Sequence, residues 1–306
     1  MILEIDARSF LTAYYRTSPR DLSLIGAGAW SQCFAFTHAN RAVVIRFGKH
    51  VEDFYKDRRA HAYEAPSLPI PEVLDIGPAF DGYYCISSRA IGAPLELVGA
   101  TQWCTLVPAL ARAMEAMRTA DISITTGIGG WNPDGQAEFG SWTAFLLSCA
   151  VDSPTHRTHG WRQKLDRHAV GAATFDWGYA LLQTVATVPA PRCLVHGDLA
   201  NRNVHVIEET ITGVFDWGCS LFGDHLYELA WFEFWAPWTP SLDIVLLRRQ
   251  LEHALRASGY RPDHLAERLQ ACYLHIGLGH LGYNAFTGNV ESLEGTAHRL
   301  RALVAI

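Results

Sequence analysis

The residue types of this chain change near residue 92, and this change restricts the fold more than any other feature of the sequence. Before it, three stretches combine β-branched and aromatic residues with breaks at Gly and Asn, a pattern typical of β-strands. One helix is expected among them, from Val51 to Ala65, because Pro66 ends it. The expected strand regions are 22–38, 41–48 and 82–90.

Beyond residue 92, apolar residues recur at helical spacing, which predicts a mainly helical region. A chain of 306 residues also exceeds the usual size of one compact core. We therefore predict an α+β fold of two lobes, a small β-rich N-lobe at 1–91 and a large, mainly helical C-lobe at 92–306. Helices are expected at 106–119, 142–150 and 175–188 and through most of the chain from Tyr227 onward, with a loop at 123–140.

Composition and charge narrow the class of protein. With 49% hydrophobic and 18% charged residues, the chain can bury a large core. The net charge of −6 lacks the basic excess of nucleic-acid-binding proteins, and no run of about 18 apolar residues predicts a membrane span. The seven cysteines are scattered without CxxC spacing, which favours free thiols. Because the N-terminus also lacks a signal peptide, we expect a cytoplasmic protein, and a monomer.

The most informative segment is CLVHGDLANRNVHVIEETITGVFDWG, residues 193–218. A short apolar strand leads into a polar loop that contains Asp198, and a β-hairpin follows. A turn centred just after Glu209 places Asn203 opposite Asp216 at the open end of this hairpin. Because the turn lacks an Asn-Gly pair, a register shifted by one residue stays open.

These residue types match the needs of phosphoryl transfer. Asp198 can orient and deprotonate an attacking hydroxyl, while Asn203 and Asp216 offer the oxygen ligands that suit Mg²⁺ beside substrate phosphates. The order of these parts is also that of the kinase catalytic loop and metal motif: an Asp, four residues, an Asn, a short hairpin and then Asp-x-Gly. Each motif alone could be an ordinary turn, but their order predicts a catalytic base and two metal ligands.

The segments HGDLANRN and FDWG resemble the HGDxxxxN and DW-containing motifs of the aminoglycoside phosphotransferase superfamily. Other segments, including FYKDRRAHAYEAPSLPIPEVLDIG and HIGLGHLGYNAFTGNV, resemble the hygromycin B phosphotransferases in the same order. The resemblance implies a protein-kinase-like fold and the use of ATP and Mg²⁺. It also implies transfer of the γ-phosphate to a hydroxyl of a cationic aminoglycoside such as hygromycin B, with antibiotic resistance as the outcome.

The resemblance further implies how the N-lobe holds the nucleotide. The glycine-rich segment 25–31 would be the nucleotide loop, with Gly28 and Ser31 near the phosphates, although alone it could be a simple hairpin turn and it is not a P-loop. The carbonyl of Ser88 and the amide of Ala90 would bind the adenine edge at the hinge between the lobes. A plain edge strand is the alternative there.

Arg46 ends a strand at the place where kinases carry a phosphate-binding lysine. The following helix offers Asp57 and Glu64 as partners, and the resemblance favours Asp57. Arg46 would then contact the phosphates with its planar guanidinium, and an ordinary salt bridge is the alternative.

A pocket for an aminoglycoside needs carboxylates and flat aromatic surfaces near Asp198. The helix after Asp224 offers Glu233 and Trp235 as substrate-binding residues, although its aromatic residues could equally be core. Asp224 is expected to cap this helix and to support the catalytic loop, and Trp142 to form part of a lid.

Two other functions stay open. A kinase that acts on choline, homoserine, a macrolide or a sugar would share every nucleotide-binding residue and differ only in its acceptor pocket. A non-catalytic nucleotide-binding module would not need Asp198, Asn203 and Asp216 together, and all three are present. A protein kinase is disfavoured because the C-lobe lacks an evident Ala-Pro-Glu segment.

Overall fold

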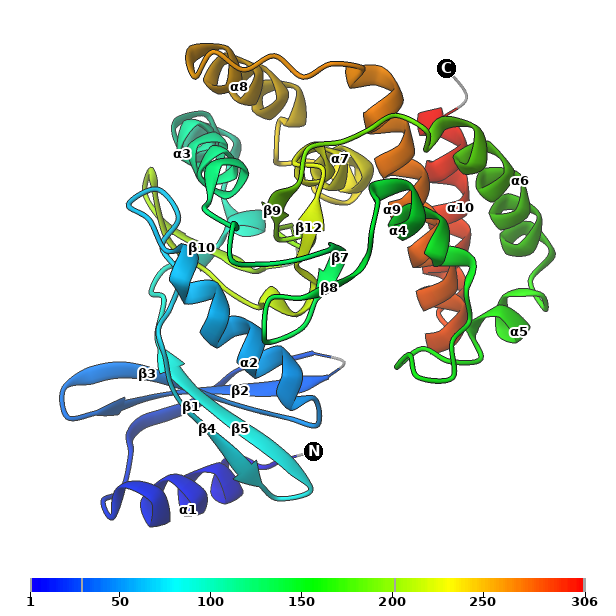
Figure 1. Ribbon diagram of the computed structural model, residues 1–306. Helices are drawn as coiled ribbons and strands as arrows, with labels where there is room; N and C mark the ends of the chain where they lie inside the picture. Colours follow the sequence, from blue (N-terminus) through cyan, green and yellow to red (C-terminus); the bar gives the residue numbers. More distant parts are fainter. Residues whose placement is uncertain (1, 29, 201, 305–306) are drawn as a thin grey trace.

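The computed structural model describes residues 2–28, 30–200 and 202–304, and within them two hydrophobic cores define a smaller and a larger part (Figure 1). The smaller part holds a 5-stranded antiparallel sheet in the order β1-β2-β3-β5-β4, with α1 and α2 on opposite faces. Its elements are α1 (Glu4–Tyr15), β1 (Arg20–Ala27), β2 (Ser31–His38), β3 (Arg41–Gly48), α2 (Val51–Ala60), β4 (Val73–Ala79) and β5 (Gly82–Ser88).

Helix α1 was not expected, because the first ninety residues were interpreted as mainly strands with one later helix. Ala7 and Leu11 of α1 are fully buried in the smaller core. Phe10 packs edge-on against Phe47, with ring centroids 5.5 Å apart, and lies 5.0 Å from Tyr84. The spacing of these apolar residues fits one helical face, so packing on the sheet stabilises a helix that is too short to be stable alone.

The larger part is mainly helical. A long helix, α9, packs against α5, α6, α7 and α10, while α3 packs against α8 (Figure 1). Its helices are α3 (Ala100–Thr119), α4 (Trp142–Leu147), α5 (Trp161–Leu165), α6 (Ala169–Val185), α7 (Leu226–Trp235), α8 (Ile244–Ala257), α9 (Leu265–Thr287) and α10 (Val290–Val304).

Two small sheets lie between these helices and the smaller part, in the orders β11-β10-β6 and β8-β7-β12-β9. The predicted loop at 123–140 is therefore wrong in part, because it contains β7 and β8. Both strands are short, and β7 is held by distant β12, a pairing that local residue types do not reveal. The strands are β6 (Ala93–Pro94), β7 (Ile128–Trp131), β8 (Ala137–Phe139), β9 (Cys193–Val195), β10 (Val204–Ile207), β11 (Thr210–Val214) and β12 (Leu221–Gly223).

The end of α2 and the segment after it are built into the larger core. Ala60, Leu68 and Ile70 are buried there with residues of the helical part, although they precede the link between β5 and β6 in sequence. A division at residue 91 thus stays a prediction.

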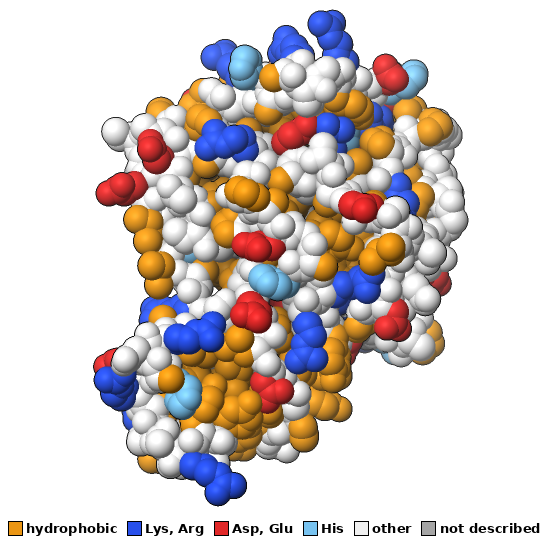
Figure 2. Space-filling model, turned by 60° about the vertical axis from the view of Figure 1, so that its left-hand side comes forward, with side chains coloured by type: hydrophobic (Ala, Val, Ile, Leu, Met, Phe, Trp, Pro, Cys, Tyr) orange, Lys and Arg blue, Asp and Glu red, His pale blue; other side chains and the backbone are white. Residues whose placement is uncertain are grey.

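The described helices of residues 2–28, 30–200 and 202–304 include none that is both long and apolar enough to cross a membrane. On the face shown in Figure 2, basic and acidic side chains are interspersed over both parts. That face therefore offers no extended surface of one charge.

Candidate active site

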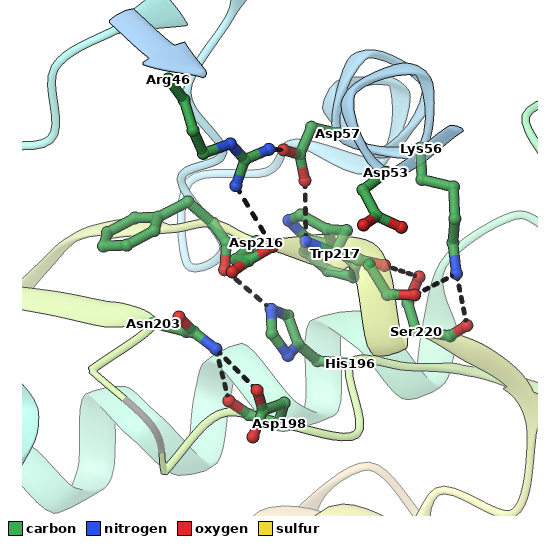
Figure 3. A network of polar contacts seen from close by, with 12 residues as sticks. Arg46, Asp53, Lys56, Asp57, His196, Asp198, Asn203, Asp216, Trp217 and Ser220 are labelled. Atoms are coloured by element: carbon green, nitrogen blue, oxygen red, sulfur yellow. Dashed lines mark hydrogen bonds and ion pairs between the residues drawn. The ribbon is translucent and has the colours of Figure 1, made fainter. Parts of the chain in front are cut away.

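Asp198 and Asn203 lie on the loop that joins β9 to β10. The Nδ2 atom of Asn203 donates hydrogen bonds to the backbone oxygen of Asp198 at 2.8 Å and to its carboxylate Oδ2 at 3.2 Å (Figure 3). Asn203 is buried. The loop thus brings together two of the three polar side chains that the motif predicts.

The hairpin register differs from the predicted one by one residue. Phe215, not Asp216, lies opposite Asn203, and its N–H donates to the Asn203 oxygen at 3.0 Å. Two local features cause this shift. The turn is a tight one with Glu208 in the left-handed region at φ 51, and an irregularity follows between β10 and β11 after His205. Asp216 therefore follows the hairpin rather than belonging to its last pair.

Asp216 comes directly before the short helical turn η4 (Trp217–Cys219) and has a left-handed backbone, with φ 63 and ψ 63. Such a conformation is uncommon outside glycine and turns the side chain away from the path of the strand. The Asp216 side chain is 47% exposed, so a ligand can reach it.

Arg46 on β3 connects the two parts of the molecule. Its Nη1 lies 3.1 Å from Asp216, and its Nη2 forms an ion pair with Asp57 of α2 (Figure 3). Asp57 also accepts a hydrogen bond from the N–H of Trp217 at 2.7 Å. The predicted pairing of Arg46 with Asp57 is thus present in the structure, while its function with phosphates stays a prediction.

The other predicted nucleotide residues lie at two places on the sheet of the smaller part. Gly28 and Ser31 flank the β1–β2 turn, where the Gly28 N–H donates to the Ser31 oxygen at 2.9 Å. Ser88 ends β5, and the Ala90 oxygen contacts Nδ1 of His205 at 3.1 Å. Cross-strand pairing places Ser31 opposite Gly48, two residues after Arg46 on β3, and Ser88 opposite Val43, three residues before Arg46.

A buried acid on α7 holds the catalytic loop, and sequence reasoning missed it. Glu228, 2% exposed, accepts hydrogen bonds from the N–H groups of His196 and Gly197, the second at 2.8 Å. Burial raises the pKa of Glu228 to about 7. A lone acid inside the apolar run LYELAWF was the available signal, since buried acids need polar partners.

Asp224 does not support this loop as expected. It accepts from the Leu226 N–H at 3.0 Å, as a helix cap does, and its carboxylate is paired with Arg268 at 2.6 Å and 2.8 Å. Its two oxygens are thus used by α7 and α9.

His196 links the catalytic loop to the end of the hairpin. Its Nε2 lies 3.0 Å from the Phe215 oxygen, and its ring packs 4.7 Å from that of Trp217 (Figure 3). Burial lowers the pKa of His196 to about 4, so the ring is neutral near pH 7. Because the Phe215 oxygen can only accept, the proton of the neutral ring sits on Nε2.

A cavity of about 250 Å³ lies in the helical part, between α9 and the segment 148–161. Burial raises the pKa of Tyr283, one of its lining residues, and the nearby charge of Asp198 adds to this shift. The cavity is therefore close to the catalytic loop. Its lining includes Cys149, His156, Trp161, His275 and Tyr283.

The substrate role of Glu233 stays a prediction, and the structure gives its carboxylate partners within the protein. Arg248 donates to both of its oxygens, at 2.6 Å and 2.9 Å, and Tyr273 donates a further bond. Glu233 lies five positions after Glu228 on α7, about 140° around the helix, so it faces away from the catalytic loop. Its charge is already neutralised between α7, α8 and α9.

Trp235 is half-buried in an aromatic cluster with Trp231, Trp238 and His280. Its substrate role stays a prediction. Trp142 is not a lid residue, because it is buried and packs directly on Gly223, where a methyl group would lie 2.2 Å from its ring.

Magnesium fits the oxygen donors at this site. The described residues contain no group of three or more His, Cys, Asp or Glu that could hold a metal by itself. Mg²⁺ does not need such a cage, because it binds through one or two protein oxygens together with phosphates and water. The exposed Asp216 carboxylate and the nearby Asn203 carboxamide are donors of this kind.

The molecule has a β-rich part, a helical part and, between them, a polar loop, a hairpin and an Asp-Trp-Gly turn. This arrangement defines a phosphotransferase of the kinase-like class. The chain belongs to the phosphotransferase enzyme family known as APH, whose sequence profile matches residues 21–266. The predicted two-lobe α+β, protein-kinase-like fold is therefore confirmed.

Relatives support this assignment. The chain is 34% identical over 289 residues to hygromycin-B 4-O-kinase of Escherichia coli, covering 94% of this chain and 81% of that protein. A ternary complex of a thermostable mutant of aminoglycoside phosphotransferase APH(4)-Ia with AMP-PNP and hygromycin B superimposes with a TM-score of 0.84, at 32% identity and 97% coverage of both chains. Spectinomycin phosphotransferase APH(9)-Ia, at 13% identity, 97% coverage of both chains and a TM-score of 0.61, shares the fold.

Proposed function

We propose that this protein is an ATP-dependent O-phosphotransferase that phosphorylates a hydroxyl of hygromycin B or a related aminocyclitol antibiotic and thereby gives resistance. The observation that carries the proposal is the 34% identity to the Escherichia coli hygromycin-B kinase across 94% of the chain. The ATP-analogue complex of the similar APH(4)-Ia supports the use of a nucleotide. We also propose that the protein is a monomer and that it lies in the cytoplasm. The seven free thiols support the cytoplasmic location.

The proposed reaction is a direct transfer between two bound substrates. The acceptor hydroxyl oxygen forms a bond to the γ-phosphorus, the bond from that phosphorus to the β-phosphate oxygen breaks, and ADP leaves. Asp198 orients the hydroxyl and accepts its proton. The hydrogen bond from Asn203 to Oδ2 of Asp198 supports this role, because it fixes the direction of the carboxylate.

We assign the nucleotide to the N-lobe, residues 1–91, and the acceptor to the C-lobe, residues 92–306. Asn203 and Asp216 would hold Mg²⁺, which when bound neutralises charge on the phosphates. Arg46, oriented by Asp57, binds the phosphates with its guanidinium.

Gly28 and Ser31 would contact the phosphates, and Ser88 and Ala90 would bind adenine through their backbone. The acceptor lies in the cavity beside Tyr283, with Trp235 as an aromatic contact. An acidic chain suits a cationic acceptor of this kind, since its net charge is −6.

The direct test is phosphorylation of hygromycin B by the purified protein with ATP and MgCl₂. Release of ADP measures the rate, and mass spectrometry identifies the product. Spectinomycin, choline, homoserine and a macrolide serve as competing acceptors. Turnover with another acceptor but none with hygromycin B would overturn the assigned acceptor. Binding of ATP without turnover on any acceptor would favour a non-catalytic nucleotide-binding module.

A further inference from the structure

A lysine of α2 reaches the segment that follows Asp216. Nζ of Lys56 donates to the backbone oxygens of Gly218 at 2.7 Å and of Ser220 at 3.0 Å (Figure 3). Lys56 is 6% exposed, and its Nζ lies 4.8 Å from the centre of the Trp131 ring. The ammonium group is thus enclosed by two carbonyls and an aromatic face.

Two neighbouring residues of α2 hold both ends of the turn η4. Asp57 accepts the N–H of Trp217 at the beginning of the turn, and Lys56 donates to the carbonyls at its end. Ser220 closes the same turn with a hydrogen bond from its hydroxyl to the Trp217 oxygen. Because Asp216 precedes this turn by one residue, the position of η4 determines where its carboxylate points.

A purely structural role explains the charge of Lys56 poorly. Within residues 2–28, 30–200 and 202–304, Lys56 forms no ion pair, although burial of an ammonium group is costly. An apolar side chain of similar length would fill the same space without that cost. What the ammonium adds is two directed, charge-assisted hydrogen bonds, and both end on the segment next to Asp216.

We propose that Lys56 is a positioning residue for the metal-binding carboxylate: by fixing η4 against α2, it keeps Asp216 directed toward the nucleotide. This inference rests on the proposed function of Asp216 as a metal ligand. Lys56 acts through the backbone of Gly218 and Ser220. It ties the metal ligand in the larger part to a helix of the nucleotide-binding part.

The test compares K56M with K164M. Lys164 is a matched control, because its Nζ also donates to a backbone oxygen, that of Phe286 at 2.6 Å, and lies 4.4 Å from an aromatic ring centre. Binding of Mn²⁺ in the presence of ADP is measured by electron paramagnetic resonance, and binding of ADP in metal-free buffer by calorimetry. Thermal unfolding of both variants gives the loss of stability.

We expect K56M to weaken Mn²⁺ binding by about tenfold or more, as loss of a group supporting a metal ligand does, while metal-free ADP binding changes less than about twofold. K164M should lose stability without either change, and K56R should restore part of the metal affinity. Unchanged Mn²⁺ affinity in K56M would overturn the proposal. If K56M does not fold, K56Q, which keeps a donor on a shorter side chain, replaces it in the same comparison.

Failure of the acceptor assignment is distinguishable from failure of this inference, because Mn²⁺ binding with ADP needs no acceptor. D216N is the reference for loss of the metal ligand itself. If D216N binds Mn²⁺ with ADP as the unmodified protein does, the assigned ligand is wrong. If only D216N weakens binding, Lys56 has no positioning role.

Discussion

Nη1 of Arg46 lies 3.1 Å from Oδ1 of Asp216, so the residue proposed to bind phosphates is paired directly with the residue proposed to bind the metal. The same guanidinium also pairs with Asp57. Two carboxylates thus share one cation in this structure. Magnesium and phosphate charges arriving together would satisfy Asp216 and Arg46 at the same time, which favours binding of the nucleotide as its magnesium complex.

Replacing Arg46 should weaken nucleotide binding more than it affects the acceptor. R46A removes a charge-assisted contact to the phosphates and is expected to cost about 1.5–3 kcal/mol, roughly 10- to 150-fold in the dissociation constant of ATP. R46K keeps the charge but lacks the planar guanidinium. Its dissociation constant for ATP should therefore lie between those of R46A and the unmodified protein. Calorimetry with ATP measures both, and an R46A protein that binds ATP normally would contradict the assigned phosphate contact.

Replacing Asp198 should stop the chemical step and spare nucleotide binding. D198A removes the group that orients the hydroxyl and accepts its proton, so kcat should fall by at least about 10²–10⁴. The dissociation constant of ATP should change little. Single-turnover assays with radiolabelled ATP give the rate, and measurable phosphorylation at an unchanged rate would refute Asp198 as the base.

Replacing Glu233 should lower stability without affecting the acceptor. E233A leaves the partly buried Arg248 without its carboxylate, which should cost about 1–3 kcal/mol in the free energy of unfolding. The KM for hygromycin B should stay within about twofold, because this ion pair faces away from Asp198. Urea unfolding and steady-state kinetics check both, and a large rise in KM alone would restore Glu233 as a substrate residue.

Stability should fall in acid because four buried histidines stay neutral in the folded chain. Burial lowers the pKa of each from 6.5 to about 4; they are His196, His225, His275 and His280. Between these values the unfolded chain binds more protons than the folded one, so the free energy of unfolding decreases as pH falls through this range. Near pH 7 the four rings are mostly neutral in either state, so the effect is small there.

H225F isolates the contribution of one histidine. Both ring nitrogens of His225 are buried without a hydrogen-bond partner among the described residues, so the ring can be replaced without breaking such a bond. Between pH 6.5 and pH 4 the free energy of unfolding of the variant should fall less than that of the unmodified protein. The slopes of this free energy against pH should differ by up to about 1.4 kcal/mol per pH unit. Parallel slopes in urea titrations would contradict this assignment.

The sequence predicts those parts of the site whose residues lie close together in the chain. Asp198, Asn203 and Asp216 occur in one short segment, and their order predicts the chemistry. Lys56 and Glu228 escaped detection because each acts through the backbone of a segment more than thirty positions away, and backbone partners leave no trace in residue types.

The errors in the fold and the pocket have related causes. The hairpin register depends on the left-handed backbone of Glu208 and on an irregularity between β10 and β11. The sequence has no Asn-Gly pair at the turn, so it does not indicate where the turn lies. The sequence does not reveal the ion pair of Glu233 with Arg248, because a helix with apolar residues on every side does not indicate which face meets the catalytic loop. Only the packing of α7 against its neighbours decides that question.

The burial of Ala60, Leu68 and Ile70 in the larger core limits how the molecule can open for its substrates. A rigid swing of the whole N-terminal region would pull these side chains into water and lose their apolar burial. The C-terminal half of α2 must therefore travel with the helical body. A motion that keeps this burial moves the β-sheet relative to the C-terminal half of α2, and the ion pair of Arg46 with Asp57 joins the two sides of that motion.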